Sequence, residues 1–145
     1  MSALVETYRG AVYPWQCDHM GHMNVMWYVG KFDEATWNLF ALVGITPTLL
    51  RTQNRGMAAV QQNISYRREL NAGDVVTVRS AVLEVRDKVL RFVHEMRNAE
   101  SGEIAAVCEL TGVHLDTAVR KSCQFPAEVL SLARARVQTY DLNQR

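Results

Sequence analysis

The residues best suited to chemistry lie in one short stretch, WQCDHMGHMNVMWYV, which runs from residue 15 to residue 29. It contains a thiol, a carboxylate, two imidazoles and an amide within the eight positions 17–24, directly before an apolar and aromatic run. Such a group could bind a metal ion, form a plain surface turn or take part in acyl transfer. Each interpretation makes a different demand on the local structure.

A metal site would use Cys17, Asp18, His19 and His22. Asp18 and His22 are four residues apart and would converge on one ion only within a helix, which the intervening Gly21 disfavours. In the plain-turn interpretation, Asp18 bonds to nearby backbone amides, Gly21 adopts a positive φ angle and the histidines are solvated. A catalytic hypothesis therefore has to be weighed against an ordinary Asx turn.

The acyl-transfer hypothesis depends on where Asp18 lies relative to the helix expected after it. A carboxylate six residues before an N-cap at Asn24 lies close to the first N–H groups of the helix, which lack intrahelical acceptors and carry positive dipole charge. Those N–H groups could stabilise an oxyanion while Asp18 attacks the carbonyl or deprotonates a water, and Gly21 would let the backbone approach the substrate. Because aspartate is a weak base, an activated acyl group such as a thioester suits this arrangement best.

The helix itself is predicted from periodicity. Apolar residues recur at three- and four-residue steps from Asn24 to about Val43, with Asn24 as the N-cap and Gly44 placed to end the helix. Its apolar side is so broad that we expect it to be buried nearly all round. A narrow polar face remains, made of Lys31, Glu34 and Asn38.

The rest of the chain predicts strands. Residues 7–13 form a first strand stopped by Pro14, and period-two patterns predict strands over residues 57–67, 75–85, 89–98 and 104–115. The phase of the third strand slips at Leu83, as a β-bulge requires. A short helix is expected after Pro126, and the last eight residues have little to hold them.

This order of elements predicts one α+β domain over residues 1–145, with its core in residues 5–116 and a short helix and tail in residues 126–145. Consecutive hairpins imply antiparallel pairing of the strands. The broad apolar surface of a single helix must be buried against other elements, and here only the sheet can do this. We therefore expect a curved antiparallel five-stranded sheet wrapped around one long central helix, in the order β-α-β-β-β-β. A single copy would leave a strand edge and part of the helix exposed, which predicts a homodimer, with pairing of dimers into a tetramer left open.

Composition excludes several classes of partner. Sixteen basic and fifteen acidic residues give a net charge of +1, which argues against a nucleic-acid partner. The sequence has no signal-peptide pattern and no long apolar run, so we expect a soluble, cytoplasmic protein with no membrane partner. Three cysteines without a CxxC spacing indicate reduced thiols.

Three motifs then occur in order, namely DHMGHMNVMWY at residues 18–28, FDEATW at 32–37 and ISYRRELNAGD at 64–74. Together they make residues 8–116 resemble the hotdog-fold acyl-CoA thioesterases of the 4-hydroxybenzoyl-CoA thioesterase-like family. The resemblance implies hydrolysis of an acyl-CoA to a carboxylic acid and free coenzyme A. It implies no cofactor, because coenzyme A enters as part of the substrate.

The resemblance also implies roles for individual residues. Asp18 matches the family's catalytic carboxylate, as nucleophile or general base, and the N–H of Val25 or Met26 would polarise the carbonyl. Tyr28 matches a position that shapes the site, while His22 and Asn24 would hold the loop and cap the helix. Basic side chains at Lys31, Arg67 and Arg68 are candidates for the nucleotide phosphates, and Trp27, with Met23, Met26 and Trp37, could line an acyl pocket.

Alternatives remain open within the same fold. A hydratase or dehydratase could use Asp18 with His22, although the Asn-Pro-(Ile/Leu)-His context of those enzymes is absent. A binding module could hold acyl-CoA without turnover, and an acyl-carrier protein could replace coenzyme A. A second thioesterase lineage uses a helix glutamate, and Glu34 is expected to be a structural acid here.

Overall fold

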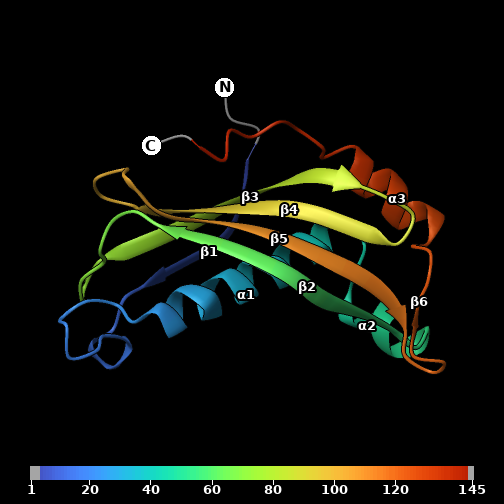
Figure 1. The fold of residues 1–145 in the computed structure, drawn as a ribbon, viewed down its shortest axis with the longest axis horizontal. Coiled ribbons are helices and arrows are strands. Elements are labelled where there is room, and N and C mark those ends of the chain that lie inside the picture. The colour runs from blue at the N-terminus through green and yellow to red at the C-terminus, as the bar shows by residue number, and fades with distance from the viewer. Residues whose placement is uncertain (1–3, 144–145) are drawn as a thin grey trace.

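The computed structural model of the chain describes residues 4–143. Figure 1 shows a sheet arched over one long helix, with the segment after the C-terminal helix on the opposite side of the sheet. The helices are η1 (Pro14–Gln16), α1 (Val25–Leu42), α2 (Pro47–Thr52) and α3 (Ala127–Arg134). The strands are β1 (Val5–Ala11), β2 (Arg55–Tyr66), β3 (Val75–Val85), β4 (Val89–Asn98), β5 (Ile104–Asp116) and β6 (Lys121–Ser122).

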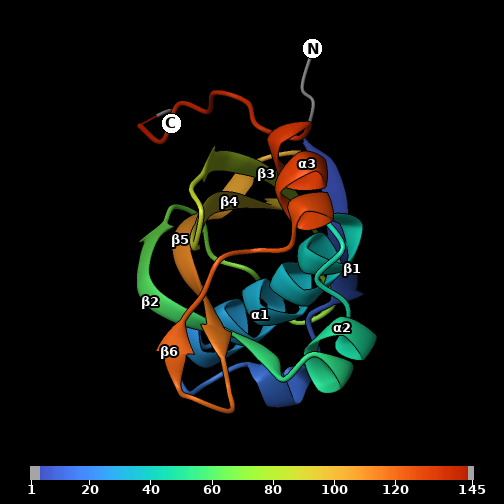
Figure 2. The same ribbon diagram turned by 90° about the vertical axis from the view of Figure 1, so that its right-hand side faces the viewer.

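The five long strands form an antiparallel sheet in the order β1-β3-β4-β5-β2, and the two-residue β6 pairs with β5. Figure 2, which looks along the helix, shows the sheet curving around α1. The helix buries Phe32, Ala35 and Leu39 completely against the concave side of the sheet. The predicted architecture is therefore confirmed, with the short elements η1, α2 and β6 added to it.

The boundaries of the central strands agree with the periodicity of the sequence. Strands β3 and β4 begin and end where they were expected, and α1 starts directly after its N-cap. In β3 the residues Val82 and Glu84 pair with the adjacent residues Phe92 and Arg91 of β4, so the predicted bulge at Leu83 is confirmed. Strand β1 instead runs two residues earlier than expected.

The prediction that α1 is buried nearly all round was wrong for the single chain. Val25, Met26 and Trp37 are exposed, with 56%, 63% and 43% of their surface accessible. Lys31, expected on a polar face, is only 2% exposed. Protein acceptors satisfy its ammonium group inside the fold. It donates to the Tyr8 hydroxyl at 2.9 Å and to a backbone carbonyl of β1 at 3.3 Å. The sheet covers one side of the helix, and the apolar side that faces away from it stays open.

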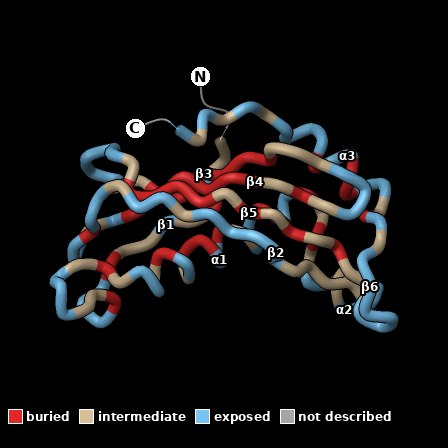
Figure 3. The backbone as a smooth tube through the Cα atoms, viewed as in Figure 1, coloured by how far each residue is buried: buried red, intermediate tan, exposed pale blue. Residues whose placement is uncertain are grey.

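Burial is uneven across the sheet as well. In Figure 3 the central strands β3, β4 and β5 carry most of the buried residues of the sheet, while the edge strand β2 is largely exposed. Strand β2 is twelve residues long and pairs only with β5 among the described residues. A long open edge of this kind presents unpaired backbone donors and acceptors to another chain.

The expectation that the last eight residues have little to hold them was wrong for residues 138–143. The Gln138 N–H donates to the Val82 carbonyl at 3.0 Å, and the Tyr140 hydroxyl donates to the Glu95 carboxylate at 2.6 Å. Residues 144 and 145 lie outside the described part of the chain. Within residues 4–143, we find no helix with the length and apolar character needed to span a bilayer.

Candidate active site

The site is built on the loop between β1 and α1. The Asp18 N–H donates to the His22 carbonyl at 3.1 Å, and the Gly21 N–H donates back to the Asp18 carbonyl at 2.9 Å. Gly21 has a φ angle of +86°, a conformation that residues with a side chain rarely adopt. Cys17 and Met23 form a β-bridge that closes the loop at its base. The loop is thus a compact turn that holds Asp18 in a defined position.

The Asp18 carboxylate accepts two hydrogen bonds. Oδ1 accepts from the Met20 N–H and Oδ2 from the Asn24 side-chain amide, each at 2.8 Å. The bond from Met20, followed by the bond from Asn24, lowers the pKa of Asp18 below its ordinary value because both donors favour the charged form. The bond to Met20 is an Asx turn, so the plain-turn geometry is present together with the link to Asn24.

Asn24 connects this carboxylate to the helix. Its side-chain oxygen accepts from the Met26 N–H at 2.9 Å, which makes it the N-cap, while its backbone carbonyl accepts from the Trp27 N–H at 2.9 Å. The Val25 N–H has no acceptor among the described residues. Two backbone N–H groups were expected to polarise a carbonyl. The Met26 N–H already donates to Asn24, so the Val25 N–H is the one that remains available.

A cleft of about 300 Å³ lies beside these groups. It brings together seven residues that the sequence singled out, namely Asp18, His22, Met23, Val25, Tyr28, Arg67 and Arg68. It is also lined by Tyr66 and Glu69, which sequence reasoning missed although both lie in the quoted motif at residues 64–74. We call this the Asp18 cleft.

Two of its lining residues are held by neighbours. The Tyr28 hydroxyl donates to the Arg68 carbonyl at 3.1 Å, and its ring packs edge-on against Tyr66. Burial raises the pKa of Tyr28 to about 12, so the phenol stays protonated at neutral pH. The His22 Nε2 lies 2.9 Å from the Glu69 carboxylate, which ties the loop to the segment after β2.

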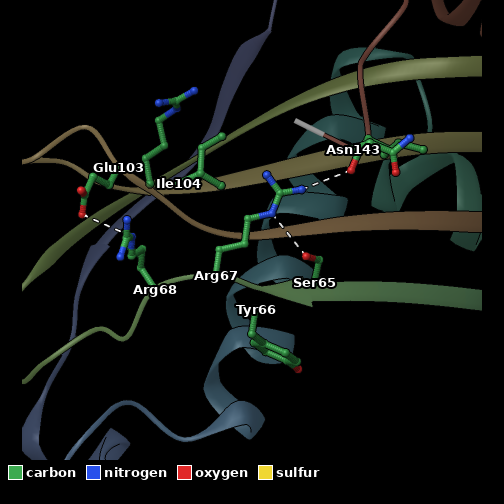
Figure 4. A pocket seen from close by; sticks show the side chains of 9 residues that line it. Ser65, Tyr66, Arg67, Arg68, Glu103, Ile104 and Asn143 are labelled. Atoms are coloured by element: carbon green, nitrogen blue, oxygen red, sulfur yellow. Dashed lines mark hydrogen bonds and ion pairs between the residues drawn. The ribbon is translucent and has the colours of Figure 1, made fainter. Parts of the chain in front are cut away.

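A larger cleft of about 910 Å³ adjoins the first and shares Tyr66, Arg67 and Arg68 with it. Figure 4 shows its polar side chains, with Arg67 directed toward Asn143 and Arg68 toward Glu103. Arg97 also lines it, so the lining holds three guanidinium groups and one carboxylate. We call this the arginine cleft, and its charge balance suits an anionic ligand.

Other predicted site residues lie elsewhere. Lys31 is buried under β1 and lines neither cleft, so the expectation that it contacts nucleotide phosphates was wrong for this chain. Trp27 is half-buried against the core and also lies outside both clefts. Trp37 instead lines a separate pocket of about 130 Å³, together with Phe40 and Met57.

The candidate metal ligands do not converge. The Cys17 thiol donates to the Tyr13 carbonyl, Asp18 bonds to Met20 and Asn24, and His22 faces Glu69. In the part of the chain that the structure describes, no group of three or more His, Cys, Asp or Glu side chains is arranged to hold a metal ion.

Comparison with known proteins connects this geometry to a family. Residues 12–132 match the sequence profile of the Thioesterase-like superfamily. A betainyl-CoA thioesterase of Pseudomonas aeruginosa is 26% identical over 140 residues, which cover 97% of this chain and 88% of that protein.

Solved structures support the fold. A Staphylococcus aureus protein determined in complex with CoA superimposes with a TM-score of 0.88 at 18% identity, over 99% of this chain and 93% of that one. A 1,4-dihydroxy-2-naphthoyl-CoA thioesterase from Synechocystis gives a TM-score of 0.78 at 16% identity, over 95% and 97% of the two chains. At these identities the likeness concerns the fold, and it agrees with the predicted sheet wrapped around a helix.

Proposed function

The chain belongs to the Thioesterase-like superfamily, and on that premise we propose that it hydrolyses an acyl-CoA to a carboxylic acid and free coenzyme A at the Asp18 cleft. Membership confirms the predicted family, the hotdog fold and the enzyme class. The observation that carries the proposal is the bond between Asp18 and Asn24, because it fixes an ionised carboxylate beside the open amide at the start of α1.

The chemistry follows from those two groups. A thioester carbonyl in the cleft would accept from the Val25 N–H, where the unpaired amide and the helix dipole both favour a developing oxyanion. A donor of this kind contributes about 3 kcal/mol to the transition state. Asp18 would then attack the carbonyl carbon, expel the coenzyme A thiolate and leave an acyl anhydride that water hydrolyses, or it would deprotonate the attacking water. The lowered pKa of Asp18 keeps the carboxylate ionised at neutral pH, as both roles require.

The neighbouring cleft supplies a place for the rest of the substrate. Because the two clefts share Tyr66, Arg67 and Arg68, one extended ligand could occupy both. We assign the nucleotide phosphates to Arg67 and Arg68, since guanidinium groups bind phosphate oxygens in bidentate geometry. The Staphylococcus aureus neighbour, which was solved with CoA, supports a coenzyme A ester as the substrate.

The acyl group is the least defined part of the substrate. Val29, which lines the pocket of Trp37, is four residues from Val25 on α1, or about 6 Å along the helix, so an acyl chain held at Val25 could extend toward that pocket. The relative that is a betainyl-CoA thioesterase gives reason to include a small cationic acyl group among the substrates tested.

A homodimer is part of the proposal. The open edge of β2 and the exposed apolar residues Val29 and Trp37 on α1 support pairing with a second copy. Val60, 60% exposed on β2, lies on the same edge strand. Tetramer formation stays a prediction.

A hydrolysis panel tests the function. Acyl-CoA esters graded by chain length, an aryl-CoA and betainyl-CoA are assayed for release of free thiol, with enoyl-CoA monitored by absorbance. We expect thiol release from at least one ester, with no change in enoyl absorbance. Enoyl turnover without thiol release would indicate a hydratase. Stabilisation by CoA without turnover of any ester would indicate a binding module.

A further inference from the structure

We propose that residues 138–143, here called the C-terminal segment, form one wall of the arginine cleft and position Arg67 and Arg97 for the phosphates of coenzyme A. This inference rests on the proposed function, because it assumes that the arginine cleft receives the nucleotide. It adds a chain segment and a third arginine to the residues that select the substrate. Leu142 and Asn143 both line the cleft.

The C-terminal segment is docked on the sheet. In Figure 1 it runs from α3 back across the side of the sheet opposite α1. The Gln138 N–H bonds to the carbonyl of Val82 in β3, and the side chains of Tyr140 and Leu142 pack against a small apolar cluster of Ala81, Val93 and Val107. This cluster lies apart from the main core around α1. The docking places the end of the segment at the arginine cleft.

Tyr140 acts on Arg97 through a shared carboxylate. Glu95 is 3% exposed, and a carboxylate so well buried needs strong donors. It receives the Tyr140 hydroxyl at 2.6 Å and the Arg97 Nε at 2.5 Å. Arg97 also donates from Nη1 to the Gly102 carbonyl at 2.6 Å. Tyr140 thus fixes the carboxylate that orients one of the three arginines of the cleft.

Leu142 acts on Arg67 directly. The Arg67 Nη2 donates to the Leu142 carbonyl at 3.2 Å, while its Nε donates to the Ser65 hydroxyl at 3.3 Å (Figure 4). Bonds from two different segments restrict the rotamers of this long side chain, and restriction before binding lowers the entropy lost when a ligand is bound. Arg67 lies in both clefts, so its orientation affects the ligand at the point where the clefts meet.

A purely structural role for the segment makes a different prediction. If residues 138–143 only covered an apolar patch, loosening them would lower stability and would affect all substrates alike. If they position the arginines, loosening them weakens binding only of ligands that carry the nucleotide. Acyl-pantetheine, which has the same thioester but no nucleotide, separates the two cases.

The test compares Tyr140→Phe, which removes one hydroxyl and keeps the ring, with Glu95→Gln, which keeps the side-chain volume and removes the charge. Gln138→Ala is the matched control, because only the backbone of Gln138 makes a hydrogen bond among the described residues. Both test variants should raise KM for acyl-CoA and Kd for free CoA about threefold to tenfold, as expected for one weakened hydrogen bond. The value of kcat, and KM for acyl-pantetheine, should stay unchanged.

Equal effects on acyl-CoA and acyl-pantetheine, or an unchanged Kd for free CoA in both variants, would overturn the inference. The measurement of Kd for free CoA tests this inference separately from the proposed hydrolysis. If the unaltered protein hydrolysed no ester and the variants still weakened CoA binding, the proposed hydrolysis would fall and the role of the segment would stand. Thermal melting of each variant identifies any loss that comes from unfolding.

Discussion

The Asn24 side-chain amide lies 2.8 Å from Asp18 Oδ2, and the oxygen of the same side chain accepts the N–H of Met26. One residue therefore caps α1 and holds the carboxylate that faces the helix N-terminus. This dual contact explains how a loop residue keeps a fixed relation to the helix. The cap on α1 and the bond to Asp18 are separate contacts, and substitution of Asn24 can test each of them individually.

Replacing Asn24 should change the pH dependence of catalysis. Its bond helps to lower the pKa of Asp18, so removing it raises that pKa, and the acid limb of kcat/KM moves to higher pH. Asn24→Ala and Asn24→Ser both lose the bond to Asp18, but serine can still cap the helix. We expect the same direction of pH shift in both variants and an additional loss of about 1 kcal/mol of stability in the alanine variant alone. Acid limbs that coincide with that of the unaltered protein would mean that Asn24 does not tune the catalytic group.

The buried His94 should make the fold sensitive to acid. Its ring is 0% exposed, and burial lowers its pKa to about 3 from an ordinary value of 6.5. Between these values the unfolded chain binds more protons, so the free energy of unfolding decreases as the pH falls from about 6.5, by up to about 1.4 kcal/mol per pH unit. Its ring nitrogens bond to Ser80 and Thr36, and the rings of Phe32 and Phe92 pack against it.

Urea unfolding at pH 7 and pH 5 measures this contribution. His94→Phe should lose less stability than the unaltered protein over this interval, because phenylalanine does not titrate. His19→Phe, at an exposed position, is the control and should keep the original pH dependence. A His94→Phe variant with the unaltered pH dependence would assign the acid sensitivity to other groups.

Val60 tests the proposed dimer. It lies in the exposed edge strand β2, so Val60→Lys costs the isolated chain little, whereas it places a charge within the interface that we propose. Light scattering after size exclusion should give a dimer for the unaltered protein and a monomer for the variant. Val119→Lys, at a similarly exposed valine in the turn before β6, should remain dimeric. A variant at position 60 that stays dimeric would move the interface away from β2.

A substitution at Arg67 tests whether this residue binds the nucleotide phosphates. Arg67→Ala should raise KM for acyl-CoA more than KM for acyl-pantetheine, because only the former carries phosphates. Arg86→Ala, which removes an exposed arginine between β3 and β4, is the control and should leave both values unchanged. If Arg67→Ala changed the two KM values equally, Arg67 would be a structural residue rather than a phosphate ligand.

The sequence predicted those features that depend on local patterns. Helix α1, strands β3 and β4 and the bulge at Leu83 follow from periodicity, and the cap at Asn24 follows from residue type. The loop carboxylate and the first turn of the helix were correctly expected to lie together. Such features are determined by residues close to one another in the chain.

Features that depend on distant contacts were missed. Lys31 is buried because Tyr8 in β1 accepts its ammonium group, and periodicity within a helix does not reveal a partner in another element. The docking of Tyr140 depends on Glu95, which is 45 residues away. The choice between the amides of Val25 and Met26 depends on which N–H the Asn24 side chain occupies, and this is a matter of side-chain geometry.

The most direct measurement compares Asp18→Asn with the unaltered protein on the best ester of the panel. Asparagine keeps the size of the side chain but is neither a nucleophile nor a base, so kcat should fall at least about a hundredfold, while Kd for free CoA and the melting temperature stay unchanged. An Asp18→Asn enzyme that turned over at nearly the original rate would contradict a role for this carboxylate in the reaction.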